Sequence, residues 1–168
     1  KTGRKRAITR AINEVAHYLG NTPAIARASY IDPRVFDRYR DAWNNHDVDA
    51  VLEFFTDDGV YEDVTVARVN RGKAEIRAFV EETFAVFPDF HVEDGPVIID
   101  PSGRYGVEWT MSGTHEGDTA IPATHKRFSL RGASGGEFEG DKIKRNSDYW
   151  NMAEFLVQVG ILPQLPSA

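Results

Sequence analysis

The stretch of sequence that decides the fold is residues 105–115, Tyr-Gly-Val-Glu-Trp-Thr-Met-Ser-Gly-Thr-His. Large apolar side chains alternate with small or polar ones over its first eight positions. This two-residue period is typical of a strand with one buried face. We therefore predict a long strand over 105–115. The preceding residues 100–103, Asp-Pro-Ser-Gly, are typical of a turn that joins it to another strand.

Similar patterns on both sides of this strand extend the prediction to the whole chain. Further strands are expected at 60–64, 90–94, 97–101, 125–138 and 142–150, and a turn at 56–59. Helical spacing is found at 7–19, 22–30, 33–43, 48–55, 74–87 and 153–159. Helices that are segregated from antiparallel strands indicate an α+β fold. We expect a curved mixed or antiparallel sheet with helices packed on one face, which leaves a cone-shaped ligand cavity.

Composition excludes several classes of site and location. The chain has 168 residues, 41% of them hydrophobic, and no Cys, which excludes disulfides, thiolate nucleophiles and zinc–thiolate centres. No apolar run approaches the roughly 18 residues that a membrane span needs. The basic residues 1–10 are not followed by the apolar core of a signal peptide, so a cytoplasmic protein without membrane partners is expected.

Charge is distributed unevenly along the chain. Residues 1–40 carry nine Lys and Arg against three acids, a net charge of +6, whereas the whole chain carries −6. The remaining 128 residues must therefore carry −12. This asymmetry favours two parts, a basic helical extension over 1–32 and a domain over 33–168. The acidic domain is a poor candidate for nucleic-acid binding.

Two short strings place one titratable group each in apolar or aromatic company. They are Gly-Thr-His-Glu-Gly at 113–117 and Asn-Ser-Asp-Tyr-Trp at 146–150, which supply His115 and Asp148. An imidazole and a carboxylate in an apolar cavity are sufficient for proton transfer on a carbon acid. Two structural alternatives remain open. His115 would be a satisfied strand residue, and Asp148 would cap the C-terminal helix.

Aromatic residues are candidates for the wall of the cavity. The predicted substrate-binding residues are Tyr61, Phe79, Trp109 and Trp150. Among the other histidines, His46 is expected in a helix-ending turn, and His91 and His125 are expected to be exposed. The five His show no metal-ligand spacing, so no metal site is predicted.

An ordered set of motifs runs through most of the chain. The motifs lie at 39–47, 54–61, 71–73, 113–117, 121–124, 141–143, 148–150 and 156–160. In this order, residues 34–162 resemble the SnoaL-like polyketide cyclases of the nuclear transport factor 2-like superfamily. The resemblance is specific to the family but not to one substrate.

The resemblance implies a reaction and roles for two residues. Family cyclases close a ring by intramolecular aldol condensation, without a metal, a cofactor or a covalent intermediate. The acid/base role falls on Asp148, whose pKa burial is expected to raise, and His115 is expected beside it, in contact with the substrate. His115 or Trp109 would donate a hydrogen bond to the enolate oxygen. The resemblance also implies a homodimer and a small apolar carbonyl compound as substrate.

Some positions depart from the family pattern, and other functions remain open. The stretch between His115 and Arg127 is more polar than usual, and Glu62 or Asp63 could bring another carboxylate to the cavity. The family also contains hydroxylase-like members and members without known activity. A related isomerase or hydrolase, or a non-catalytic binding or scaffold protein, is therefore an alternative.

The N-terminal segment resembles a different family. Residues 14–24 and 28–35 are similar to the C-terminal nucleophile segment of bacterial type IB DNA topoisomerases, in which the tyrosine of a Ser-Tyr-Ile-Asp-Pro string attacks a DNA phosphate. That resemblance places Tyr30 at the nucleophile position. The cationic residues that such a reaction needs come from a preceding domain in that family. We expect a helical extension with at most weak DNA affinity and no topoisomerase activity.

Overall fold

The computed structural model describes residues 9–11, 13–14 and 34–164. Residues 9–11 and 13–14 are helical, in agreement with the helix predicted over 7–19. The helix predicted at 22–30, Tyr30 and most of the basic extension lie outside the described residues. The elements of the main body are α3 (Arg34–Asn44), α4 (Val48–Glu53), β1 (Phe55–Asp63), β2 (Arg68–Arg71), α5 (Gly72–Val86), β3 (His91–Ile99), β4 (Arg104–Thr114), β5 (Arg127–Glu139), β6 (Lys142–Trp150) and α6 (Met152–Gln158).

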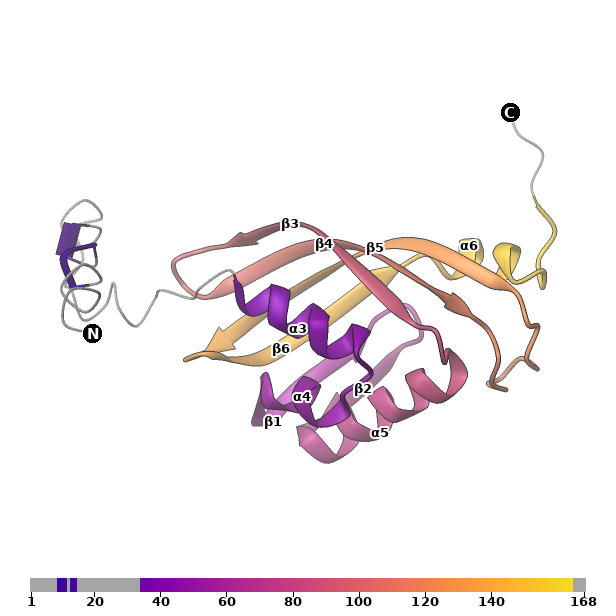
Figure 1. The fold of residues 1–168 in the computed structure, drawn as a ribbon, viewed down its shortest axis with the longest axis horizontal. Helices are drawn as coiled ribbons and strands as arrows, with labels where there is room; N and C mark the ends of the chain where they lie inside the picture. Colours follow the sequence, from indigo (N-terminus) through magenta and orange to yellow (C-terminus); the bar gives the residue numbers. More distant parts are fainter. Residues whose placement is uncertain (1–8, 12, 15–33, 165–168) are drawn as a thin grey trace.

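The described strands form one six-stranded mixed sheet in the order β2-β1-β6-β5-β4-β3. The β1–β6 pair is parallel and the other pairs are antiparallel. Strands β4 and β5 stay in register from Arg104 opposite Glu137 to Thr114 opposite Arg127. Figure 1 shows the long, bent sheet with α3, α4 and α5 together on one face. The predicted α+β fold is confirmed, and so is the long strand that begins near Tyr105.

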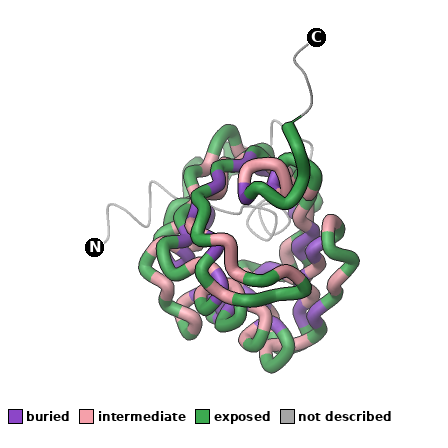
Figure 2. Tube along the Cα trace, turned by 90° about the vertical axis from the view of Figure 1, so that its right-hand side faces the viewer, coloured by how far each residue is buried: buried purple, intermediate pink, exposed green. Residues whose placement is uncertain are grey.

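The hydrophobic core lies between these helices and the sheet. Buried side chains of α3, α4 and α5 meet those of β1, β4 and β6, among them Phe36, Trp43, Val51, Ile76, Val80, Tyr61, Val107 and Ile143. A smaller cluster joins α6 to β5 through Phe128, Leu130, Phe155 and Val159. Figure 2 shows buried positions interspersed with exposed ones along the trace, as strands with one covered face require.

The structure corrects three element boundaries. Residues 90–94 and 97–101 were expected as two strands, but β3 is one strand with a register shift between Asp94 and Val97. Pro96 lies at this shift on an edge strand, where a missing N–H costs little. The helix expected over 48–55 ends at Glu53, and the turn expected at 56–59 is part of β1. Strand β2 was not predicted at all.

Local capping explains where the helices start. The side chain of Asp47 accepts a hydrogen bond from the backbone N–H of Ala50 and caps α4, whereas Asn151 caps α6. Asp148 is therefore not the cap of the C-terminal helix. His46, at φ 54°, lies in the turn after α3, as predicted. Within the described part of the chain, no helix combines the length and the apolar character that a membrane span requires.

Candidate active site

A cavity of about 440 Å³ lies between the sheet and the helices. All six side chains predicted as catalytic or substrate-binding line it, namely Tyr61, Phe79, Trp109, His115, Asp148 and Trp150. Its other walls are mainly aromatic or aliphatic. They include Trp43, Val86, Phe87, Phe90, Met111, Phe128 and Phe155. The fold thus brings residues from β1, β4, β6 and α5 together around one apolar pocket with few charged groups.

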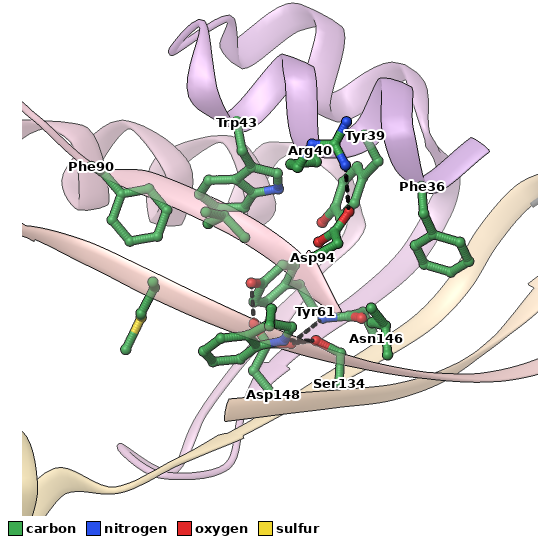
Figure 3. A pocket seen from close by; sticks show the side chains of 14 residues that line it. Phe36, Tyr39, Arg40, Trp43, Tyr61, Phe90, Asp94, Ser134, Asn146 and Asp148 are labelled. Carbon is green, nitrogen blue, oxygen red and sulfur yellow. Dashed lines mark hydrogen bonds and ion pairs between the residues drawn. The ribbon is translucent and has the colours of Figure 1, made fainter. Parts of the chain in front are cut away.

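Asp148 is held on the sheet wall by three side-chain donors. Its Oδ1 accepts hydrogen bonds from Ser134 Oγ at 2.6 Å and from Asn146 Nδ2 at 2.7 Å. Its Oδ2 accepts one from the hydroxyl of Tyr61. Figure 3 shows these three side chains converging on the carboxylate from β5, β6 and β1. Such a network fixes the orientation of Asp148 before a ligand binds.

Two aromatic residues of β4 donate hydrogen bonds to the partners of Asp148. Trp109 Nε1 donates to Ser134 Oγ at 2.7 Å, and the hydroxyl of Tyr105 donates to Asn146 Oδ1 at 2.6 Å. The expected role of Trp109 as a donor to an enolate oxygen does not fit this geometry, because its one N–H already binds Ser134. Trp109 contributes its ring to the cavity wall instead.

Burial sets the ionisation of the carboxylate and of its tyrosine partner. Burial raises the pKa of Asp148 to about 6, although the hydrogen bonds from Ser134, Tyr61 and Asn146 act in the opposite direction. Asp148 is half-buried because it faces the cavity. Burial, followed by the charge of Asp148, holds the pKa of Tyr61 well above its usual value. Tyr61 therefore stays protonated and keeps donating near neutrality.

A second, smaller cavity of about 80 Å³ meets the large one at Asp148. It lies on the α3 side of the carboxylate, where Figure 3 shows Tyr39, Arg40 and Asp94. The Arg40 guanidinium lies 3.6 Å from Asp94, whose pKa is raised by burial and lowered by Arg40, with burial the larger effect. The buried hydroxyl of Tyr39 has no hydrogen-bond partner within the part of the chain that the structure describes. Asp148 thus lines both cavities.

His115 lies at the other end of the large cavity. It is fully buried, and its ring is 6.0 Å from that of Phe87 and 5.8 Å from that of Phe155. Its Nδ1 is 3.2 Å from Thr124 Oγ1, and no described residue forms a hydrogen bond with its Nε2. The imidazole is therefore buried in the pocket wall with one unsatisfied nitrogen.

His115 and Asp148 share the cavity, but no hydrogen bond or ion pair joins them. Asp148 is in register with Ser134, which is in register with Val107, eight residues before His115. That spacing corresponds to roughly 26 Å measured along a strand. The bend of the sheet brings both residues onto one cavity. The expectation that the histidine lies directly beside the carboxylate is therefore not confirmed, although both residues line one cavity.

Asp63 is the second carboxylate in the cavity. It is in register with Asp148 on the neighbouring strand and accepts hydrogen bonds from Trp150 Nε1 at 3.1 Å on both oxygens. Burial raises its pKa above the usual range. Glu62, one residue earlier, binds Arg145 and Ser147 instead. Of the two carboxylates considered from the sequence, Asp63 reaches the cavity.

Charged residues are few at the pocket. Arg68 lies over the ring of Phe79 at 5.1 Å and pairs with Glu82 at 2.5 Å. The loop residues Thr119 and Ile121 line the same cavity. Among the residues that the structure describes, no three His, Asp or Glu side chains gather in a way that could hold a metal ion.

Sequence reasoning missed Ser134 and Asn146 as functional residues, although they hold the carboxylate. The signal for Asn146 is its spacing, since positions 146, 148 and 150 of one strand face the same side. The role of Ser134 can be identified only from the pairing of β5 with β6, which places Ser134 opposite Asp148. His91 and His125 are exposed, as predicted.

Comparison with solved structures shows the same fold in several bacterial proteins. A candidate polyketide cyclase from Xanthomonas campestris pv. campestris matches with a TM-score of 0.69 and 24% identity, over 80% of this chain and 97% of that one. TsrD from Streptomyces laurentii matches with a TM-score of 0.70 and 18% identity, over 79% and 100%. AclR, a candidate hydroxylase from Streptomyces galilaeus, matches with a TM-score of 0.66 and 23% identity, over 78% and 82%.

These identities are low, so the similar structures establish the fold alone. No curated protein matches the chain. The family model of the SnoaL-like polyketide cyclases, in contrast, matches residues 33–159, which include the whole cavity. The chain belongs to the SnoaL-like polyketide cyclase family.

Proposed function

We propose that the chain is an acid/base enzyme that closes a ring by aldol condensation, or catalyses a related isomerisation or hydrolysis, on a small uncharged carbonyl compound. The observation that supports it best is the state of Asp148. This carboxylate is held by three donors in an apolar cavity, and burial raises its pKa to about 6. A carboxylate with a pKa near neutrality is a useful base and, once protonated, a useful acid.

The oxygen best placed to take the proton is Oδ2 of Asp148. Oδ1 already accepts hydrogen bonds from Ser134 and Asn146. Oδ2 accepts one, from Tyr61, among the described residues. A carboxylate oxygen has two lone pairs, so Oδ2 keeps one for the substrate.

The proposed reaction returns the proton that it removes. Asp148 takes a proton from the carbon beside a carbonyl group, which leaves an enolate. The enolate carbon attacks a second carbonyl of the same molecule, forms a C–C bond and leaves an alkoxide. The alkoxide takes the proton from Asp148, so the ring closes without net proton change and without an oxidant or reductant. At the far end, the buried His115 Nε2 has no hydrogen-bond partner among the described residues, so a side-chain movement that exposes it to the cavity would let it bind a substrate oxygen.

The charge of the cavity favours a neutral substrate. The charged side chains that line it are three carboxylates and one guanidinium, namely Asp63, Glu82, Asp148 and Arg68. Arg68 is paired with Glu82, and among the described residues no ion pair joins a cation to Asp63 or Asp148. An anionic ligand would be repelled by this surplus. A ketone or an ester fits better than a free acid.

A proton-exchange experiment tests the proposed base directly. The probe is 2-tetralone, a neutral bicyclic ketone small enough for the cavity, incubated with the full chain in D2O. Deuterium incorporation beside the carbonyl is followed by NMR. We expect exchange above the rate without enzyme, and a loss of about 100-fold or more in Asp148→Asn.

The matched control is Glu62→Gln, a carboxylate on β1 that binds Arg145 and Ser147 rather than facing the cavity. It should exchange 2-tetralone like the wild type. Undiminished exchange in Asp148→Asn would overturn the assignment of the base. Binding of 2-tetralone without any exchange in the wild type would favour the alternative of a non-catalytic binding protein.

A further inference from the structure

We propose that two glycines of β5, Gly132 and Gly136, are positioning residues of the site. Each makes room for an aromatic side chain of β4 whose polar end orients one of the two partners of Asp148 Oδ1. The inference rests on the proposed function only for the role of Asp148 as a base. The hydrogen-bond geometry that supports it is independent of any substrate.

Gly132 makes room for Trp109. The two residues are directly opposite in the β4–β5 pairing, and a Cβ atom on Gly132 would overlap the six-membered ring of the indole. All three of its nearest neighbours would be atoms of that ring. The indole therefore lies across β5 at this point. From there, its N–H reaches Ser134 Oγ at 2.7 Å.

Gly136 repeats the arrangement four residues along the same strand. It is directly opposite Tyr105, and a Cβ atom there would overlap the Tyr105 phenol and the carbonyl oxygen of Arg145. The phenol lies across β5, and its hydroxyl reaches Asn146 Oδ1 at 2.6 Å. Ser134 lies between the two glycines on the same face of the strand.

These contacts determine which way the partners of Asp148 point. A serine hydroxyl has one proton, and the N–H of Trp109 occupies its acceptor side, so the proton is directed to Asp148. An asparagine amide has an acceptor end and a donor end. The hydroxyl of Tyr105 binds the acceptor end of Asn146, so the donor end faces Asp148. Both aromatic donors thus act on the carboxylate through an intermediate side chain.

Gly135 offers a matched comparison within the same strand. A Cβ atom there would have its nearest neighbour, the carbonyl oxygen of Tyr105, at 3.9 Å, which is an ordinary contact. Gly135 faces the opposite side of the sheet from Ser134 and Gly136. A methyl group at 135 therefore tests the general cost of alanine in this strand without displacing an aromatic ring.

The test is the titration of Asp148 in Gly132→Ala. The full chain is labelled with ¹³C at aspartate carboxyls, and Asp148→Asn assigns the resonance. Loss of an oriented donor should raise the pKa of Asp148 by about one, which is the effect of one hydrogen bond to a charged group. Gly135→Ala should leave the pKa of Asp148 unchanged.

Trp109→Phe is the second variant, because it removes the N–H and keeps Gly132. It should raise the pKa of Asp148 as Gly132→Ala does, and the double variant should show no additional rise. An unchanged pKa in folded Gly132→Ala would overturn the proposal, as would an unchanged pKa in Trp109→Phe if Gly132→Ala does not fold. These readouts need no turnover, so failure of the 2-tetralone exchange would not affect them.

Discussion

The two ends of the cavity differ in how their polar groups are satisfied. At one end, Asp148 accepts hydrogen bonds from Tyr61, Ser134 and Asn146. At the other end, His115 is fully buried, more so than the half-buried Asp148, but its Nε2 has no hydrogen-bond partner among the described residues. A fully partnered group is fixed by the fold, whereas an unsatisfied buried group costs stability unless a ligand completes it.

We infer from this difference a division of roles between the two ends of the pocket. The Asp148 end is built to hold a base in a fixed orientation, with its hydrogen bonds supplied by the chain. The His115 end holds a buried nitrogen that has no hydrogen-bond partner among the described residues and that a substrate oxygen would satisfy on reaching it. If the division is correct, substitutions at the first end change chemistry and stability together, whereas those at the second change binding alone.

The largest effect is expected for Asp148→Asn. Removal of the base should lower the rate of proton exchange or ring closure by about 10²–10⁴-fold, while the fold is retained. Rate measurements and circular dichroism on the same sample test this. A variant that keeps its rate would remove the distinction between the two ends.

The pH dependence of stability gives the next largest effect. Because burial raises the pKa of Asp148 to about 6, the folded state binds a proton more tightly than the unfolded state. The contribution of Asp148 to stability is therefore complete below about pH 4 and is lost as the pH rises through 6.

That loss amounts to roughly 3 kcal/mol in the free energy of unfolding. Denaturant titrations from pH 4 to pH 8 should show this loss of stability in the wild type. Asp148→Asn should not show it, because the variant has no carboxyl group at position 148 to titrate. Parallel curves for the two proteins would show that Asp148 has an ordinary carboxyl environment.

Tyr61→Phe sharpens the comparison at the Asp148 end. The variant loses the hydrogen bond to Oδ2, so the pKa of Asp148 should rise by about one and the free energy of unfolding at pH 8 should fall by about 1.5–3 kcal/mol. Urea denaturation and carboxyl NMR measure both. No change in either would mean that the hydroxyl does not hold the carboxylate.

His115→Leu gives the smallest expected effect on stability. Because the imidazole leaves Nε2 unsatisfied, an apolar side chain should change the free energy of unfolding by less than about 1 kcal/mol. The affinity for 2-tetralone should fall about tenfold, the loss of one hydrogen bond. A stability loss as large as that of Tyr61→Phe would contradict the division between the two ends.

The fold was largely predictable because its longest strands have a clear two-residue period. Large apolar residues alternate with small or polar ones over 105–112 of β4, and β5 and β6 were also predicted as strands. Strand β2 was missed because its four residues, 68–71, are mostly polar. It is held by pairing with β1 and by Asn70, whose Nδ2 donates to the carbonyl oxygen of Tyr61. Tertiary contacts, not local pattern, make this segment a strand.

The types of residue in the site could be predicted from the sequence, but the hydrogen bonds between them could not. Asp148 and the aromatic wall follow from the strand faces and the family motifs. The distance between His115 and Asp148 could not be predicted, because it depends on the register of β4, β5 and β6. The role of Ser134 could not be predicted either, since a serine between glycines has no pattern that identifies its partner across the sheet.

The most direct test of the central claim, that Asp148 is a base held ready by the fold, is the ¹³C titration of its carboxyl group in the wild-type chain without ligand. The carboxyl group of Asp148 should titrate with a pKa of about 6, because burial outweighs three hydrogen bonds. A pKa near 4 or below would contradict it, since such a carboxylate would be too weak a base for the proposed proton transfer.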